Sequence, residues 1–266
     1  MKQYNNTDQH LHFLCQVIAK ANRSFVPKNR DDSHTNLYFD SLGNRITGRW
    51  IKVKNEKFIC SLNLANLHYE ISNDAQKVFA SIPSIGSTMD EIEEKIEKSL
   101  SELGLKTRDF REKLHFKISE YDFIKAPVAA IESVALAEWK EMRELANEAC
   151  FHLLGHLQNK EEIRIWPHHF DTGIYTIINS NIGLGFGLAM QDEMVGEPYF
   201  YMSGNSLDST INYIDLPSDK DWRWEIGKKW NGAVLSLNQL FDKTEDEQKA
   251  ILRNFIINAY AWYAKQ

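Results

Sequence analysis

Apolar residues along this chain switch between helical and strand-like spacing, and the order of these segments narrows the choice of architecture. Leu11, Leu14 and Ile18 recur at intervals of three and four residues, which predicts an amphipathic helix from about Thr7 to Ala21. Short β-favouring runs separated by turn-prone breaks follow this helix: Leu37–Phe39, Ile46–Val53, Phe58–Leu64 and Leu67–Ile71. Adjacent runs of this kind predict an antiparallel meander.

Two capping boxes, in which a threonine is followed three residues later by a glutamate, predict the starts of two further helices. Thr88 and Glu91 begin the first of them, and Gly104 supplies a left-handed residue that can end it. Thr244 and Glu247 begin a helix that runs to the C-terminus.

A long helix is expected between the two capped ones. It follows a short strand near Leu114–Ile118, starts after Pro127 and continues to about Leu157, so its roughly thirty residues would cross a domain. Strand-like runs then return: Ile163–Trp166, Phe170–Ile178, Ile182–Met190, Tyr199–Met202 and Gly232–Leu235, with a polar loop over Ser203–Asp221.

Because the strands come in adjacent runs and do not alternate strictly with helices, the sequence predicts the α+β class. We expect antiparallel sheets packed against the long central helix and the C-terminal helix. Residues 1–266 are predicted to form a single domain, with two loosely similar sub-domains that meet near residue 125 as the alternative.

Charge and hydropathy exclude several classes of function. A net charge of −6 leaves no excess of cations for phosphates, so nucleic acid is not expected as a partner. The N-terminus has no apolar leader and no run of about 18 apolar residues occurs, so no membrane partner is expected. Cys15, Cys60 and Cys150 are predicted to be buried free thiols, which indicates a cytoplasmic protein.

Two histidines lie near the end of the long helix. His152 and His156 are four residues apart, the spacing of helical zinc-binding pairs, and the helical wheel predicts that both are at least half buried. Leu153 stands where the helical metalloprotease motif has its glutamate. We therefore expect core histidines, with a zinc pair as the alternative.

The run from Trp166 to Asp171 is the densest group of unusual residue types in the chain. If it continues as a strand, alternation places His169, Asp171 and Tyr175 on one face. A carboxylate beside an imidazole fixes the ring and favours its protonated form, which suits a general acid or base, a substrate clamp or a metal ligand.

A second polar face is predicted downstream, where alternation groups Glu197, Tyr199 and Tyr201. Glycines at every second position from Gly183 to Gly187 leave one face of another strand without side chains, so that a ligand, an aromatic ring or another backbone can approach it. No lysine of a phosphate-binding loop follows these glycines.

These segments together resemble an uncharacterised bacterial domain family of unknown function. The resemblance covers about the last hundred residues and depends on an ordered set of motifs: Trp166-Pro167, His169-Phe170-Asp171, Gly187 with Asp192, Glu197-Pro198-Tyr199, and Trp230-Asn231. It implies no particular activity. Ala189 stands where relatives often have a serine, so no serine nucleophile is expected in that loop.

Three interpretations of the polar cluster follow. The first is a structural network of hydrogen bonds, and the second is a pocket for a small polar molecule. The third is a hydrolase-like enzyme in which His169, Asp171 and Glu197 hold a divalent metal such as Mn or Mg. The residues of the predicted pocket are Trp166, His169, Asp171, Tyr175, Asp192, Glu197, Tyr199, Tyr201 and Trp230.

Overall fold

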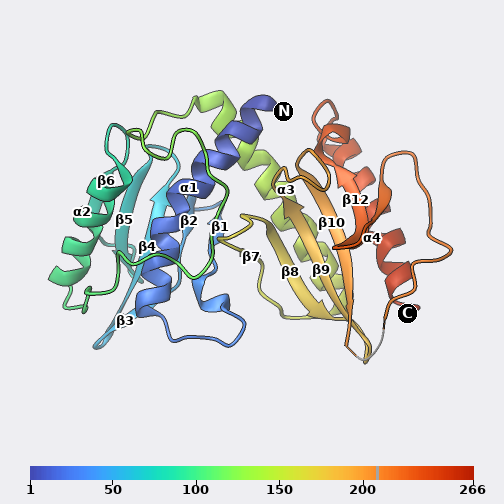
Figure 1. Cartoon of the computed structure of the whole chain (residues 1–266), viewed down its shortest axis with the longest axis horizontal. Coiled ribbons are helices and arrows are strands. Elements are labelled where there is room, and N and C mark those ends of the chain that lie inside the picture. The colour runs from blue at the N-terminus through green and yellow to red at the C-terminus, as the bar shows by residue number, and fades with distance from the viewer. Residues whose placement is uncertain (208–209) are drawn as a thin grey trace. The chain divides into compact units, whose positions relative to one another are not determined.

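The structure, a computed structural model, describes residues 1–207 and 210–266 (Figure 1). Within these ranges the chain forms four α-helices and two antiparallel sheets, which confirms the α+β class. The helices are α1 (Lys2–Phe25), α2 (Met89–Glu102), α3 (Ser133–Leu157) and α4 (Glu245–Tyr263). The predicted long helix and C-terminal helix are α3 and α4, and both capping boxes are formed.

The chain divides into two compact units. The N-terminal unit comprises Asn6–Lys140 and Arg164–Phe170. The C-terminal unit comprises Met1–Asn5, Glu141–Ile163 and Asp171–Gln266. The division falls within α3, and residue 125 lies inside the N-terminal unit. Hydrophobic patterning marks the ends of elements, so a division within a continuous helix has no signature in the sequence.

The sheet of the N-terminal unit is the predicted antiparallel meander. Its order is β1-β2-β4-β5-β6, and β3 pairs with β4. The strands are β1 (Tyr38–Asp40), β2 (Arg45–Thr47), β3 (Ile51–Val53), β4 (Glu56–Asn63), β5 (His68–Asn73) and β6 (Val78–Pro83). The edge strand β6 was not predicted, because most of its side chains are exposed and its apolar residues do not alternate.

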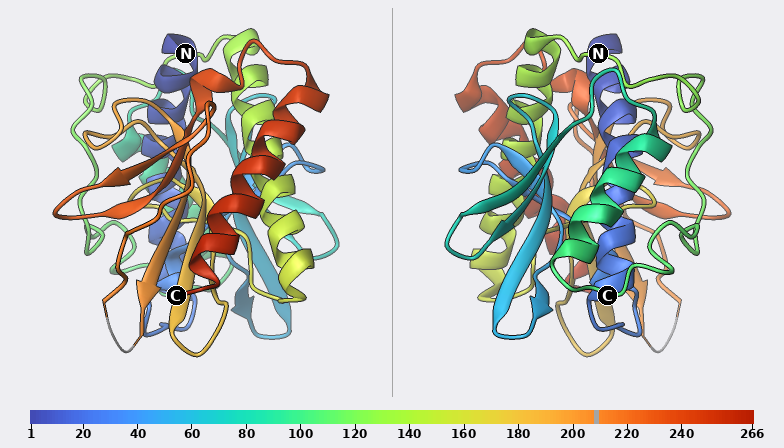
Figure 2. Two further views of the ribbon diagram at one scale, coloured as in Figure 1. Left: turned by 90° about the vertical axis from the view of Figure 1, so that its right-hand side faces the viewer. Right: turned by 90° about the vertical axis from the view of Figure 1, so that its left-hand side faces the viewer.

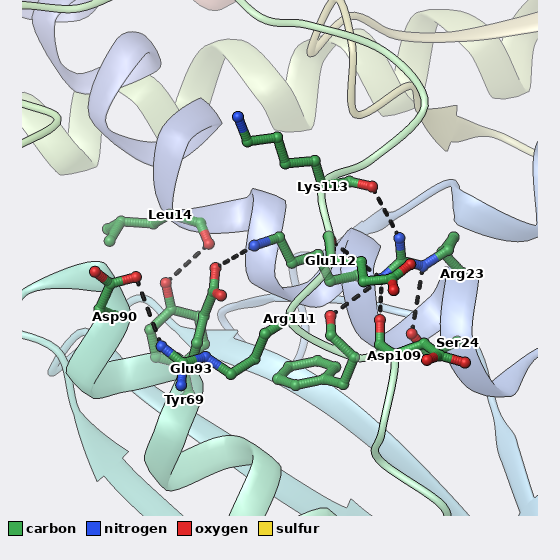
Figure 3. A network of polar contacts seen from close by, with 12 residues as sticks. Leu14, Arg23, Ser24, Tyr69, Asp90, Glu93, Asp109, Arg111, Glu112 and Lys113 are labelled. Atoms are coloured by element: carbon green, nitrogen blue, oxygen red, sulfur yellow. Dashed lines mark hydrogen bonds and ion pairs between the residues drawn. The ribbon is translucent and has the colours of Figure 1, made fainter.

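Helices α1 and α2 lie side by side in this unit (Figures 2 and 3). An ion pair of 2.6 Å between Lys20 and Glu93 joins the two helices. The hydroxyl of Tyr69 on β5 donates to the carbonyl oxygen of Leu14 at 2.8 Å and ties α1 to the sheet. These bonds satisfy polar groups beneath the helices, where water is excluded.

Residues 103–132 contain no helix or strand, so the strand predicted near Leu114–Ile118 is wrong. The guanidinium of Arg23 holds part of this segment by donating to successive backbone carbonyls, including those of Asp109 at 2.8 Å and Lys113 at 3.0 Å (Figure 3). Side-chain anchoring of the backbone takes the place of strand pairing here, which alternation in the sequence could not reveal.

In the described part of the C-terminal unit, five strands follow the order β11-β12-β10-β9-β8, all antiparallel. They are β8 (Thr172–Ile177), β9 (Ile182–Ala189), β10 (Tyr199–Ser206), β11 (Arg223–Ile226) and β12 (Asn231–Ser236). The short strand β7 (Arg164–Ile165) belongs to the N-terminal unit and forms a bridge with Leu37. Of the loop predicted over Ser203–Asp221, the first four residues extend β10, and Asp208 and Ser209 lie outside the described residues.

Alternation gives this sheet two unlike faces. Leu184, Phe186 and Met202 are fully buried on the face covered by α4 and the second half of α3 (Figure 2). The opposite face, which we call the glycine face, carries Gly183, Gly185 and Gly187 of β9 beside Tyr175 of β8 and Tyr199, Tyr201 and Ser203 of β10. Most of the predicted pocket residues therefore lie on or beside one face.

None of the helices in the described residues has the length and apolar character that crossing a bilayer requires.

Candidate functional site

Two tyrosines of β10 donate hydrogen bonds to two carboxylates at one end of the glycine face. The hydroxyl of Tyr201 lies 2.7 Å from Oδ2 of Asp171, and that of Tyr199 lies 2.8 Å from Oδ2 of Asp192. Burial, together with these carboxylates, raises the pKa of both tyrosines above the ordinary value. Both phenols therefore stay protonated near pH 7 and act as hydrogen-bond donors.

The loop between β9 and β10 is organised around Asp192. Its Oδ1 accepts hydrogen bonds from the backbone amides of Met194 and Val195, both at 2.9 Å. Gly196 has a φ of 81°, a left-handed conformation that suits glycine. Glu197, at the end of the loop, accepts a hydrogen bond from the side-chain amide of Asn238. Asp192 and Glu197 thus have separate structural partners.

The three glycines of β9 differ in the space that a side chain would find at each position. A Cβ atom at Gly187 would overlap the carbonyl oxygen of Thr172, and one at Gly183 would overlap the phenol of Tyr175. At Gly185 the nearest atom to such a Cβ would be Oγ of Ser203, at 3.3 Å. Close packing of the backbone therefore requires glycine at position 187, the movable phenol of Tyr175 covers Gly183, and Gly185 forms an open floor.

A cavity of about 330 Å³ lies over this floor. Three aromatic side chains, those of Tyr175, Tyr213 and Trp230, line it, and the ring of Trp230 lies 6.4 Å from that of Tyr199. Ser203, Asn205 and Lys229 add polar side chains to the lining that can bond a ligand. Aromatic walls with a few polar groups are typical of sites for small polar molecules.

Trp166 and His169 do not belong to this cavity. Pro167–His169 form a turn closed by a 2.6 Å bond from the amide of Phe170 to the carbonyl oxygen of Trp166, and Phe170 has a φ of 54°. The strand predicted to carry His169 and Asp171 on one face is therefore wrong, because this turn breaks the alternation. Trp166 and His169 lie in the N-terminal unit and Asp171 in the C-terminal unit.

The predicted histidine pair of α3 is also placed differently. His152 and His156 are both exposed, so the expectation that both are at least half buried is wrong. They line a groove of about 570 Å³ between α3 and α4. Helical spacing shows which face a residue belongs to, whereas the neighbouring helix decides whether that face is covered.

Among residues 1–207 and 210–266, no group of three His, Cys, Asp or Glu side chains is close enough to hold a metal ion. Asp171 and Glu197 instead bond to Tyr201 and Asn238. The set of His169, Asp171 and Glu197 predicted as metal ligands therefore has no support in the geometry.

Several residues at the site were missed by the sequence analysis. Ser203 and Asn205 continue the alternation of Tyr199 and Tyr201 on β10, and that alternation was the available signal. Outside the cavity, on the helix-covered face of the sheet, Arg143 of α3 had no such signal: it is fully buried and donates to Oγ1 of Thr172 at 2.8 Å. A single arginine on a helix is ordinarily expected on the solvent side.

Comparisons with protein-family models, with curated proteins and with solved structures found no match to this chain. The resemblance of its last hundred residues to an uncharacterised bacterial family stays a prediction from the motifs.

Proposed function

We propose that this protein binds a small polar molecule in the cavity over Gly185. The observation that carries the proposal is the state of the polar side chains that line it. Within the described residues, Ser203, Asn205 and Lys229 make no side-chain hydrogen bond or ion pair, although all three line the same cavity as Tyr175 and Trp230. Polar side chains that have no partner within the protein and converge beside aromatic walls are available to bond a ligand.

The charge of the lining favours a ligand with an anionic group. Among residues 1–207 and 210–266, Lys229 is the cation that lines the cavity, and no Asp or Glu side chain of these ranges lines it. Tyr175 and Trp230 offer faces for a ring, while the hydroxyl of Ser203 and the amide of Asn205 can bond hydroxyl groups. A hydroxylated ring that carries a carboxylate or phosphate matches every one of these groups.

In this proposal the tyrosine–carboxylate pairs have a structural role. Tyr199 bonds the loop of Asp192 to β10, and Tyr201 bonds the residue before β8 to β10. The ring of Tyr199 also packs edge to face against the ring of Trp230. A rigid support of this kind keeps a binding site in shape before the ligand arrives, which lowers the entropic cost of binding.

We also propose a cytoplasmic location. The three cysteines are unpaired and buried, as is usual in a reducing compartment.

Titration calorimetry with glucuronate and with glucose tests the proposed function. Glucuronate carries a ring face, hydroxyls and a carboxylate, whereas glucose lacks only the carboxylate. We expect glucuronate to bind more tightly, and Trp230→Ala to abolish binding, because stacking on an aromatic ring supplies much of the affinity for such a ring.

Substitutions at two adjacent lysines measure how much the charge of Lys229 contributes to binding. Lys229→Met is expected to weaken glucuronate binding by about tenfold, as the loss of one charge-assisted bond implies. Lys228→Met changes the adjacent exposed lysine, which does not line the cavity, and should leave binding unchanged. Equal effects of the two substitutions, or no binding of either sugar, would overturn the proposal.

A further inference from the structure

A second cavity, of about 280 Å³, lies wholly within the N-terminal unit. Its lining comes from three places in the chain: the segment around the short 3-10 helix Ser33–Thr35, the long segment after α2, and the turn that begins at Trp166. It is separate from the cavity over Gly185, so nothing below depends on the function proposed above.

Two adjacent carboxylates, those of Asp31 and Asp32, face this cavity. Oδ2 of Asp32 lies 3.3 Å from Nε2 of His115, and Oδ2 of Asp31 lies 3.9 Å from a guanidinium nitrogen of Arg164. Hydrogen bonds from Ser33 lower the pKa of Asp31 below its usual value. The cavity therefore has an anionic side at neutral pH.

The other sides are aromatic. Phe116 and Trp166 line the cavity, and the ring of His168 lies 5.5 Å from that of Phe116. Burial, with a smaller contribution from the neighbouring His169, lowers the pKa of His168 to about 4. This imidazole is therefore neutral at pH 7 and adds no positive charge that would repel a cation.

The amide of Asn36 gives an independent indication of a ligand. Asn36 lines the cavity and is only 2% exposed, and its Nδ2 has no hydrogen-bond partner among the described residues. A buried donor without an acceptor is costly, so most such groups in folded proteins are satisfied. A bound molecule with an oxygen atom would supply the acceptor.

We propose that this cavity binds a small organic ammonium ion that also carries a hydroxyl or carbonyl oxygen. The carboxylates of Asp31 and Asp32 attract the positive charge, and the faces of Trp166 and Phe116 receive the ammonium group by cation–π attraction. The amide of Asn36 donates to the oxygen of the ligand. A volume of about 280 Å³ lies at the small end of the range for ligand pockets, which suits a small molecule.

The test uses the full chain and three probes: choline, ethanolamine and 3,3-dimethylbutan-1-ol, which has the shape of choline without its charge. Binding is measured by calorimetry and by chemical-shift changes of the histidine ring protons. We expect choline or ethanolamine to bind at least about tenfold more tightly than the neutral alcohol, because only the ammonium ions gain from carboxylates and ring faces. The resonances of His115 and His168 should shift on binding.

Three substitutions locate the site. Asp32→Asn keeps the size of the side chain, removes its charge, and should weaken ammonium binding by about tenfold. Trp166→Leu should weaken it through loss of the ring face. Asp122→Asn changes an exposed carboxylate of the same unit outside the cavity and should have no effect. Circular dichroism spectra establish that each variant is folded.

Equal affinity for the neutral alcohol, no binding of either ammonium ion, or ammonium binding that Asp32→Asn and Trp166→Leu both leave unchanged would overturn the proposal.

Discussion

Tyr201 on β10 donates a 2.7 Å hydrogen bond to Asp171, which directly precedes β8, so a single bond spans the intervening strand β9. Gly187 of β9 pairs with Tyr201 on one side and with Gly173 of β8 on the other, so it lies between the two strands that this bond joins. The glycine spacing and the polar pair, which are separate motifs in the sequence, therefore form one arrangement.

Removing this bond should destabilise the protein. Tyr201→Phe leaves the ring in place and deletes the donor, so the carboxylate of Asp171 loses one of its buried partners. We expect the free energy of unfolding to fall by about 1–2 kcal/mol, as measured by urea denaturation. Tyr260→Phe is the matched control, because the hydroxyl of Tyr260 makes no hydrogen bond in the described residues. Equal losses in the two variants would contradict the prediction.

The glycines of β9 should differ in their tolerance of a methyl group. Gly187→Ala forces a Cβ against the carbonyl oxygen of Thr172 and should cost about 2–3 kcal/mol of stability. Gly185→Ala meets only the rotatable hydroxyl of Ser203 and should cost less than about 1 kcal/mol. Thermal denaturation of both variants gives the comparison, and a larger loss at Gly185 would show that its surroundings are not open.

The pKa of His168, lowered to about 4 by burial, links stability to pH. The unfolded chain protonates this imidazole near pH 6.5, so between about pH 6.5 and 4 the unfolded state binds more protons than the native state. The stabilising contribution of neutral His168 is thus complete above about pH 6.5 and is lost as the pH falls through 4.

The variant His168→Gln should therefore lose less stability than the wild type between pH 7 and pH 4. Denaturation curves at a series of pH values measure the difference. An NMR titration of the imidazole protons gives the pKa directly, and a value for His168 near 6.5 would refute the assignment.

The cysteines should be unreactive in the native protein. Cys15, Cys60 and Cys150 are buried, and burial raises the pKa of Cys60 to about 12, so little of the reactive thiolate is present at pH 8. We expect Ellman's reagent to modify no thiol in the folded chain within minutes and all three after denaturation. Rapid modification of a thiol in the folded protein would contradict this.

Local patterns in the sequence predicted the elements well where one face of an element is buried. The capping box at Thr88 predicted the start of α2, and the apolar residues Ile92, Ile96 and Leu100 are buried in that helix at helical spacing. The same logic failed for β6, whose side chains are mostly exposed, and for Leu114–Ile118, whose backbone is held by Arg23 and not by a neighbouring strand.

The structure brings some of the residues predicted for the site onto one face and places others elsewhere. Alternation placed Tyr199 and Tyr201 together on β10, and both lie on one face with Tyr175 of β8. Trp166 and His169 were grouped with them because the run was read as a continuous strand, whereas the left-handed residue Phe170 ends a turn there.

By itself the sequence determined the helices, most of the strands and the capped helix ends, because these depend on the spacing of neighbouring residues. Only the tertiary structure decided that the space beside Gly185 is open while backbone atoms occupy the space beside Gly187. It also decided that Asn205 and Lys229 line one cavity, and that Asp31, Asn36 and Trp166 line another. Those outcomes depend on contacts between segments far apart in the chain, and local spacing carries no information about such contacts.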